Sequence, residues 1–205
     1  MTAKILAYVL VVLLGGYSVF SLKGEKFDIN RLSRIGMFSA LTIILYMIKL
    51  VPFPQGGGCS LLSVLPIMIL SVIVGKSEAL FCGIVVAFLK LIISPPYFLM
   101  QIPLDYFGAM MALSLTPIFG THSKIKLLTG ALLASGLSLF FSILSGVIFF
   151  GQYAPEGMNT WWYSIAYNGT GYGVEVVLSC MVLLVLPLET IKKAVRLDSA
   201  NRYVR

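Results

Sequence analysis

Three ionisable side chains, Lys90, Asp105 and Glu175, lie inside long apolar segments of the sequence. A charge at mid-bilayer depth costs about 2.5–3.5 kcal/mol on insertion scales, so such groups usually face a bundle interior and find partners there. The residues alone allow two interpretations. Either Lys90 forms an internal ion pair with Asp105 or Glu175, or these groups line a site for a polar ligand.

A second group of candidate residues lies between residues 145 and 169. Aromatic rings, amides and one carboxylate, Glu156, separate two apolar segments there. Trp and Tyr rings gather where membrane meets water, because each ring has an apolar body and a polar tip. The stretch is therefore either an aromatic belt that joins two helices or a loop that covers a pocket for a flat, polar small molecule. We expect Glu156 to shape this loop.

The motifs of catalysis are missing from the sequence. His122 is the single histidine, and the chain has no His-Glu-x-x-His, Gly-x-Ser-x-Gly or Walker-type phosphate-binding motif. Cys59, Cys82 and Cys180 are scattered, without metal-ligand spacing or an obvious disulfide pair. We therefore expect no enzyme, no cofactor and no metal site, and any ATP-driven activity would need a separate ATPase.

The composition predicts a polytopic helical membrane protein. Of 205 residues, 59% are hydrophobic and only 11% are charged, whereas an ordinary soluble domain has about 25% charged residues. A spanning helix needs about 20 residues, so roughly six or seven spans use the whole chain. The expected apolar segments are Ile5 to Leu22, Ile35 to Phe53, Leu61 to Val74, Ala79 to Ser94, Pro103 to Gly120, Leu127 to Phe150 and Trp162 to Leu188.

Basic residues predict the orientation of these segments. Most of the 15 Lys and Arg residues fall on one side if the segments simply alternate across the membrane. The positive-inside rule then places the basic turns and the C-terminal tail in the cytoplasm. The net charge of +7 thus reflects membrane orientation and not nucleic-acid binding. The loops around residues 56–58, 95–96 and 150–160 face outside, which suggests an outward-facing site.

Several segments resemble the thiamine-specific substrate-binding (S) components of energy-coupling-factor (ECF) transporters. The resemblance covers about residues 31 to 193 and implies a six-helix core with a vitamin site near its outer face. It rests on residues 145–150 (SGVIFF), 153–158 (YAPEGM), 163–164 (YS) and 167–169 (YNG), with weaker support from 56–60, 65–67 and 104–106 (LDY).

The resemblance also implies roles for single residues. Asp105 would anchor a cation or aminopyrimidine, Tyr163 would stack on a ring, and Asn168 would contact ring nitrogens. Where the family has a histidine and a stacking tryptophan, this chain has Ser142 and Phe150. The substrate is therefore expected to be thiamine or a thiamine-like small molecule. The candidate substrate-binding residues are Lys90, Asp105, Tyr106, Ser142, Phe150, Trp161, Trp162, Tyr163, Asn168 and Glu175.

The expected fold is an all-α polytopic membrane protein in three parts. An extra N-terminal transmembrane helix and basic linker (1–30) precede the six-helix S-component core (31–193), and a cytoplasmic basic tail (194–205) follows. The resemblance implies two cytoplasmic ATPases and a membrane scaffold subunit as partners. Gly36 and Ala40, which form a small-xxx-small strip that lets another helix approach closely, would meet the scaffold.

Two alternatives to this assignment stay open at the level of sequence. The chain could be a stand-alone transporter that uses Asp105, Glu175 and Lys90 as a proton or ion relay. It could also be a membrane assembly subunit without transport activity, in which the N-terminal span recruits a partner.

Overall fold

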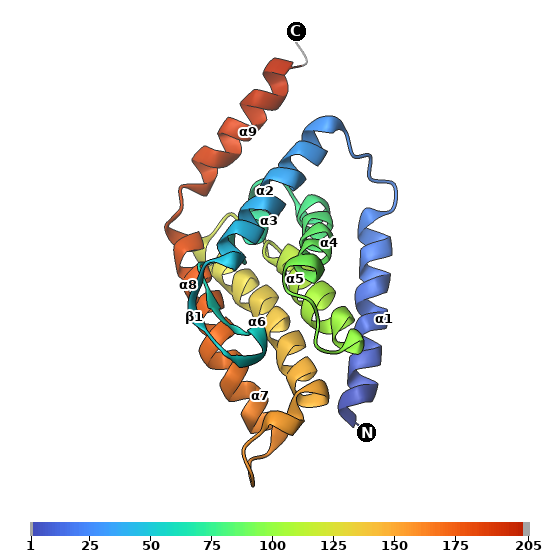
Figure 1. The fold of residues 1–205 in the computed structure, drawn as a ribbon. Helices are drawn as coiled ribbons and strands as arrows, with labels where there is room; N and C mark the ends of the chain where they lie inside the picture. The colour runs from blue at the N-terminus through green and yellow to red at the C-terminus, as the bar shows by residue number, and fades with distance from the viewer. Residues whose placement is uncertain (1, 203–205) are drawn as a thin grey trace.

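A bundle of helices makes up the computed structural model, which describes residues 2–202 (Figure 1). The all-α fold class is confirmed, with a small two-stranded hairpin as an addition. The α-helices are α1 (Thr2–Leu22), α2 (Ile29–Met47), α3 (Leu65–Ile73), α4 (Lys76–Ile93), α5 (Ala109–Ala112), α6 (Lys124–Phe149), α7 (Thr160–Asn168), α8 (Val174–Val185) and α9 (Leu188–Arg202). Two π-helical segments, Ile102–Gly108 and Gly169–Gly173, lead into α5 and α8.

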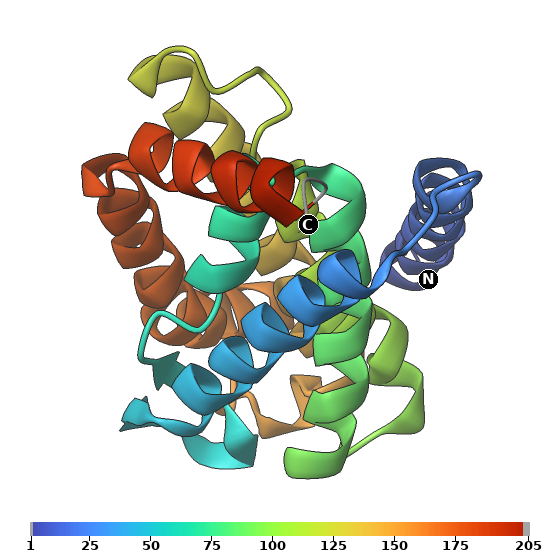
Figure 2. The same ribbon diagram turned by 90° about the horizontal axis from the view of Figure 1, so that it is seen from above.

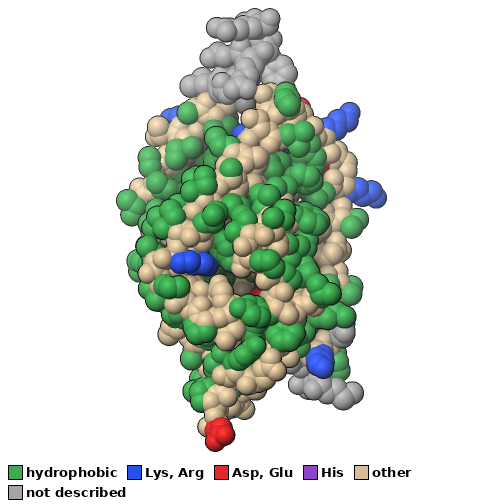
Figure 3. All heavy atoms as spheres, viewed as in Figure 1, with side chains coloured by type: hydrophobic (Ala, Val, Ile, Leu, Met, Phe, Trp, Pro, Cys, Tyr) green, Lys and Arg blue, Asp and Glu red, His purple; other side chains and the backbone are tan. Residues whose placement is uncertain are grey.

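The surface of the bundle is suited to lipid. Figure 3 shows hydrophobic side chains over most of the middle of one face, with charged groups mainly toward the two ends. Among residues 2–202, three helical stretches are long and apolar enough to cross a membrane by length and composition, namely Lys4–Leu22, Lys124–Phe149 and Thr160–Val185. The expected span from Pro103 to Gly120 corresponds to a shorter apolar stretch, Leu99–Leu115. The chain is thus a multi-pass membrane protein with helices of unequal length.

Helix starts follow ordinary capping chemistry. The Asp28 carboxylate accepts a hydrogen bond from the backbone N–H of Arg31 at 2.8 Å, so α2 begins earlier than the apolar pattern predicts. Asn159 caps α7 in the same way, accepting from the N–H of Trp161 at 2.8 Å. Each cap satisfies a backbone donor that has no partner within the helix.

The hairpin replaces the end of the second predicted span. Strands β1 (Lys49–Pro52) and β2 (Gly58–Ser60) pair antiparallel, with Val51 opposite Cys59. The sequence predicted a helix as far as Phe53 and then a loop. The strands were not recognisable, because Pro and Gly in such short strands hide any alternating pattern. Figure 1 shows the hairpin across the front of the bundle, beside α6 and α8.

The helix α1 lies at the edge of the bundle, as both views show (Figures 1 and 2). It contacts α4, α6 and the π-helical segment at 102–108. The hydroxyl groups of Tyr17 on α1 and of Ser114, just after α5, lie 3.2 Å apart. On the other side of α1, Val12, Val19 and Phe20 are at least 71% exposed and so are placed to face lipid.

A cluster of ionic contacts fixes the linker after α1 to the bundle. Glu78, at the start of α4, is buried and accepts hydrogen bonds from Arg31 and Arg34 of α2 at 2.8–3.1 Å. Glu25 in the linker pairs with Arg31 at 2.7 Å and accepts from the Ser77 hydroxyl at 2.7 Å. The linker is therefore held against the ends of α2 and α4.

Candidate functional site

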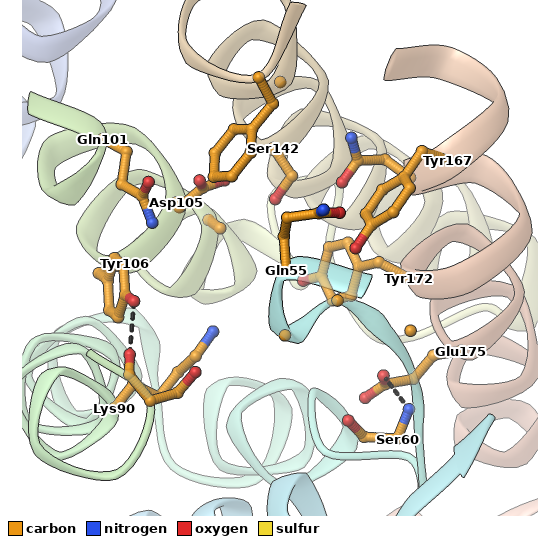
Figure 4. A pocket seen from close by; sticks show the side chains of 18 of the residues that line it. Gln55, Ser60, Lys90, Gln101, Asp105, Tyr106, Ser142, Tyr167, Tyr172 and Glu175 are labelled. Carbon is orange, nitrogen blue, oxygen red and sulfur yellow. Dashed lines mark hydrogen bonds between the residues drawn. The ribbon is translucent and has the colours of Figure 1, made fainter. Parts of the chain in front are cut away.

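A cavity of about 160 Å³ lies inside the bundle, beneath the hairpin. Its walls come from α2, the hairpin, α4, the segment 101–110, α6, α7, the π-helical segment before α8 and the start of α8 (Figure 4). Eight of the ten predicted binding residues line it: Lys90, Asp105, Tyr106, Ser142, Phe150, Tyr163, Asn168 and Glu175. Elements far apart in the sequence therefore bring most of the candidate residues together.

The first carboxylate of the cavity, Asp105, lies on the π-helical segment Ile102–Gly108. The Ser145 hydroxyl of α6 donates to Asp105 Oδ2 at 2.6 Å. Ser142, one turn earlier on α6, also lines the cavity beside Asp105 (Figure 4). A carboxylate held by one hydroxyl keeps acceptor capacity for a ligand, since it can take several hydrogen bonds.

The second carboxylate, Glu175, has partners of its own. It is 2% exposed and accepts from the backbone N–H of Ser60 at 2.9 Å and from the N–H and hydroxyl of Ser63 at 2.7 and 2.5 Å. These bonds fix the end of β2 and the approach to α3 onto α8. Glu175 therefore lines the cavity while holding the hairpin in place.

The internal ion pair, one of the two interpretations that the sequence allowed for Lys90, does not form. Within the described chain, no carboxylate oxygen of Asp105 or Glu175 lies within 4.0 Å of its ammonium group. The Lys90 Nζ atom instead lies 4.7 Å from the ring centroid of Tyr46 and 5.6 Å from that of Tyr106. Aromatic faces attract cations, so these rings provide part of the stabilisation that an ion pair would have given.

Aromatic and amide groups form the opposite wall. Tyr163 lines the cavity with Tyr167, one helical turn later, their ring centroids 6.0 Å apart. The Asn168 amide donates to the carbonyl and hydroxyl oxygens of Ser164 at 3.0 and 3.2 Å. The helices α6 and α7 pack closely here, since the Ser164 hydroxyl donates to the Ile143 carbonyl of α6 at 2.6 Å and a Cβ atom added to Gly146 would lie 2.2 Å from Ser164 Oγ.

Two predicted stacking residues lie elsewhere. Trp161 and Trp162 are 37% and 68% exposed on α7 and are not part of the cavity lining. The helix turns about 100° per residue, so a helix that presents Tyr163 and Tyr167 to the cavity points these neighbours away. The two indoles fit the alternative interpretation, an aromatic belt at the membrane surface.

Gln55 is a cavity residue that sequence reasoning missed. It lies at the tip of the hairpin, and Figure 4 shows its side chain extending into the middle of the cavity. Its backbone has φ 54° and ψ 25°, a left-handed conformation that non-glycine residues rarely adopt and that concentrates at ligand-contacting loops. Only the neighbouring Pro54 and Gly56 hinted at an unusual turn here.

Further lining residues were not predicted either. The Tyr167 hydroxyl donates to the carbonyl of Pro54 and so fastens the hairpin tip over the cavity. Gln101 and Tyr172 also line it, and Tyr172 hydrogen-bonds the Ser138 hydroxyl at 2.6 Å. Polar residues inside apolar segments were the available signal. Tyrosine and serine in such segments are too common for that signal to single these positions out.

The predicted docking strip is on the surface. Gly36 and Ala40 are both exposed on α2, and a Cβ atom added to Gly36 would meet nothing within 4 Å. Another helix could therefore approach α2 closely at this point. Its role in docking stays a prediction.

Known proteins share both the sequence pattern and the fold. A family model described as thiamine transporter protein matches residues 32–195. The thiamine transporter ThiT of Bacillus subtilis is 28% identical over 186 residues, which cover 83% of this chain and 96% of that protein. ThiT of Lacticaseibacillus paracasei is 37% identical over 57 residues, 28% of each chain.

A solved structure has the same fold. ThiT from Listeria monocytogenes matches with a TM-score of 0.68 at 21% identity, over 80% of this chain and 95% of that one. The family resemblance drawn from the sequence is confirmed, and the family is one of transporters and not of enzymes. This chain belongs to the thiamine transporter protein family.

Proposed function

We propose that this protein captures thiamine, or a close analogue, in its cavity from outside the cell and delivers it as the substrate-binding subunit of an ATP-driven transporter. The observation that carries this proposal is the shared cavity of Asp105, Tyr163 and Asn168. Thiamine joins a cationic thiazolium ring to an aminopyrimidine. A carboxylate, an aromatic face and an amide are the groups that such a molecule needs.

Each group has a role in the proposed complex. Asp105, held by Ser145, would accept a hydrogen bond from the aminopyrimidine or face the thiazolium charge. Tyr163 and Phe150 would stack on the rings. Asn168 would contact ring nitrogens while Ser164 fixes its amide. Glu175 would act through the hairpin, which it holds over the bound ligand.

Binding to the purified full chain tests this proposal. Isothermal titration calorimetry in detergent is preferable to tryptophan quenching, since both indoles lie outside the cavity lining. We expect saturable thiamine binding, which Asp105→Asn and Asn168→Ala weaken roughly ten- to a hundredfold, because a ligand hydrogen bond involving a charge is worth about 1.5–3 kcal/mol. Glu156→Gln, an exposed loop carboxylate, is the matched control and should change nothing.

Two outcomes would contradict the assignment. No thiamine binding by the folded wild-type chain would remove thiamine as substrate. Equal losses in Asp105→Asn and Glu156→Gln would show that the cavity is not where thiamine binds. A different water-soluble vitamin that binds in its place would keep the transport class and change the substrate.

The outward orientation and the partners form the second half of the proposal. The positive-inside pattern supports a cytoplasmic C-terminus, with the aromatic connection between α6 and α7 outside. The exposed small-residue strip of α2 supports docking to a scaffold subunit that carries two ATPases. The stand-alone relay has less support, because three donors already occupy the Glu175 carboxylate.

Substitution of the strip tests the docking. Gly36→Leu should leave thiamine affinity intact and abolish co-purification with a co-expressed scaffold, because its side chain would separate the helices. Gly136→Leu on α6, where an added Cβ also meets nothing within 4 Å, is the matched control. Thiamine uptake that continues in cells without the ATPases would instead support the stand-alone alternative.

A further inference from the structure

Two lysine side chains converge on one region of the cavity. Lys49 follows α2 at the start of the hairpin, and Lys90 lies in the last turn of α4. Their Nζ atoms lie 4.0 and 4.7 Å from the ring centroid of the same residue, Tyr46. All three residues line the cavity. Two positive charges therefore share one end of the binding space.

These ammonium groups have no anionic partner in the described chain. Lys49 donates to the Ser60 hydroxyl at 3.0 Å, and neither lysine has a carboxylate oxygen within 4.0 Å. The carboxylates that face the cavity, Asp105 and Glu175, receive hydrogen bonds from serine hydroxyl and backbone donors. Within the described chain, neither lysine charge is thus neutralised by direct contact with a carboxylate.

Such an arrangement favours a bound anion. Both lysines are half-buried and face the cavity, and their like charges repel each other, so an anion placed between them would relieve this repulsion. The cation–π contacts with Tyr46 offset only part of this repulsion. A bound phosphate would accept hydrogen bonds from both amines, and charge-assisted bonds of this kind are the strong ones.

We propose that the cavity takes a phosphate monoester of its thiamine-like ligand, with the phosphate between Lys49 and Lys90. This inference rests on the proposed function and extends it to the class of substrate. Figure 4 shows Lys90 across the cavity from Tyr167, with Gln55 between them. A ligand with an aromatic cation at the α7 wall and an anion at the lysines would match both ends.

Thiamine monophosphate is the probe, with thiamine as reference, both titrated calorimetrically into the purified full chain. We expect the monophosphate to bind at least as tightly as thiamine. Lys90→Met should weaken the monophosphate about tenfold or more, since it removes a charge-assisted hydrogen bond. The same variant should strengthen thiamine binding, because it removes a positive charge that repels the thiazolium ring. A purely structural role for Lys90 would weaken both ligands together.

Controls separate charge from fold. Lys90→Arg keeps the charge and should keep the preference for the ester. Lys76→Met, at the exposed first position of the same helix, should leave both affinities unchanged. If Lys90→Met does not fold, two other measurements test the phosphate subsite. Lys49→Met should also weaken the monophosphate, and inorganic phosphate should compete with the monophosphate for the wild-type protein.

The outcomes distinguish this inference from the function on which it rests. The phosphate subsite alone would be overturned if wild type bound thiamine but bound the monophosphate tenfold more weakly, and if Lys90→Met left the ratio of the two affinities unchanged. If inorganic phosphate strengthened thiamine binding, the lysines would bind a separate phosphate ion, and the proposal of a phosphate ester as ligand would be overturned. Failure of both ligands to bind would overturn the proposed function as well.

Discussion

Replacing Glu175 with glutamine should loosen the hairpin and thereby weaken ligand binding. One carboxylate oxygen accepts from Ser60 N–H and the other from the N–H and hydroxyl of Ser63. Glutamine keeps one oxygen and places an NH₂ donor where the other was, so at least one backbone N–H loses its acceptor. The remaining bonds lose their charge assistance.

The expected magnitude follows from these bonds. Losing one charge-assisted hydrogen bond and leaving a buried N–H unpaired together cost about 3 kcal/mol. For a chain of this size that corresponds to a fall in Tm of roughly 6–12 °C. Ser63→Ala removes the hydroxyl contact alone and should cost about 1 kcal/mol, which places it between wild type and Glu175→Gln.

The assay combines thermal unfolding in detergent with thiamine titration. Glu175→Gln should lower both Tm and affinity, whereas Asp105→Asn should lower affinity at nearly unchanged Tm. The exposed carboxylate variant Glu156→Gln is the control for the chemical change itself. If Glu175→Gln kept the wild-type Tm but lost thiamine binding, Glu175 would be a direct ligand contact and the positioning argument would be refuted.

Two further predictions concern packing and pH. Gly146→Ala should lower Tm and thiamine affinity, because its Cβ would meet Ser164 Oγ at 2.2 Å, whereas Gly136→Ala on the same helix should be neutral or stabilising. The Ser77 hydroxyl bond holds the pKa of Glu25 below its usual 4.5, so this linker contact is complete above that pH and is lost as pH falls through the lowered value. In wild type, proteolysis of the linker should therefore accelerate as the pH falls. In Glu25→Gln, it should already be fast at neutral pH.

The sequence predicted several of the side chains that line the cavity, although not how they would contact one another. Lys90, Asp105 and Glu175 were recognisable because charge inside apolar segments must face an interior. Their contact partners could not be predicted, because a shift of a few ångströms between neighbouring helices decides whether Lys90 meets a carboxylate or an aromatic ring. Trp161 and Trp162 illustrate the same limit, because a segment rich in rings does not say which ring faces inward.

The hairpin was beyond prediction for a different reason. Its strands are three and four residues long and contain Pro and Gly, so no alternating pattern marks them. Its position depends on contacts distant in sequence, above all those of Glu175. Gln55 reaches the cavity only because this hairpin folds back over the bundle, which explains why its role could not be predicted from its neighbours in the chain.

Both π-helical segments border the cavity. Asp105 and Tyr106 of Ile102–Gly108 and Tyr172 of Gly169–Gly173 line it, and such turns occur frequently at functional sites. Over Gly169–Gly173, an added Cβ on Gly171 would press at 3.0–3.1 Å on the hairpin. The glycine at 171 therefore lets this π-helical segment pack closely against the hairpin that covers the cavity.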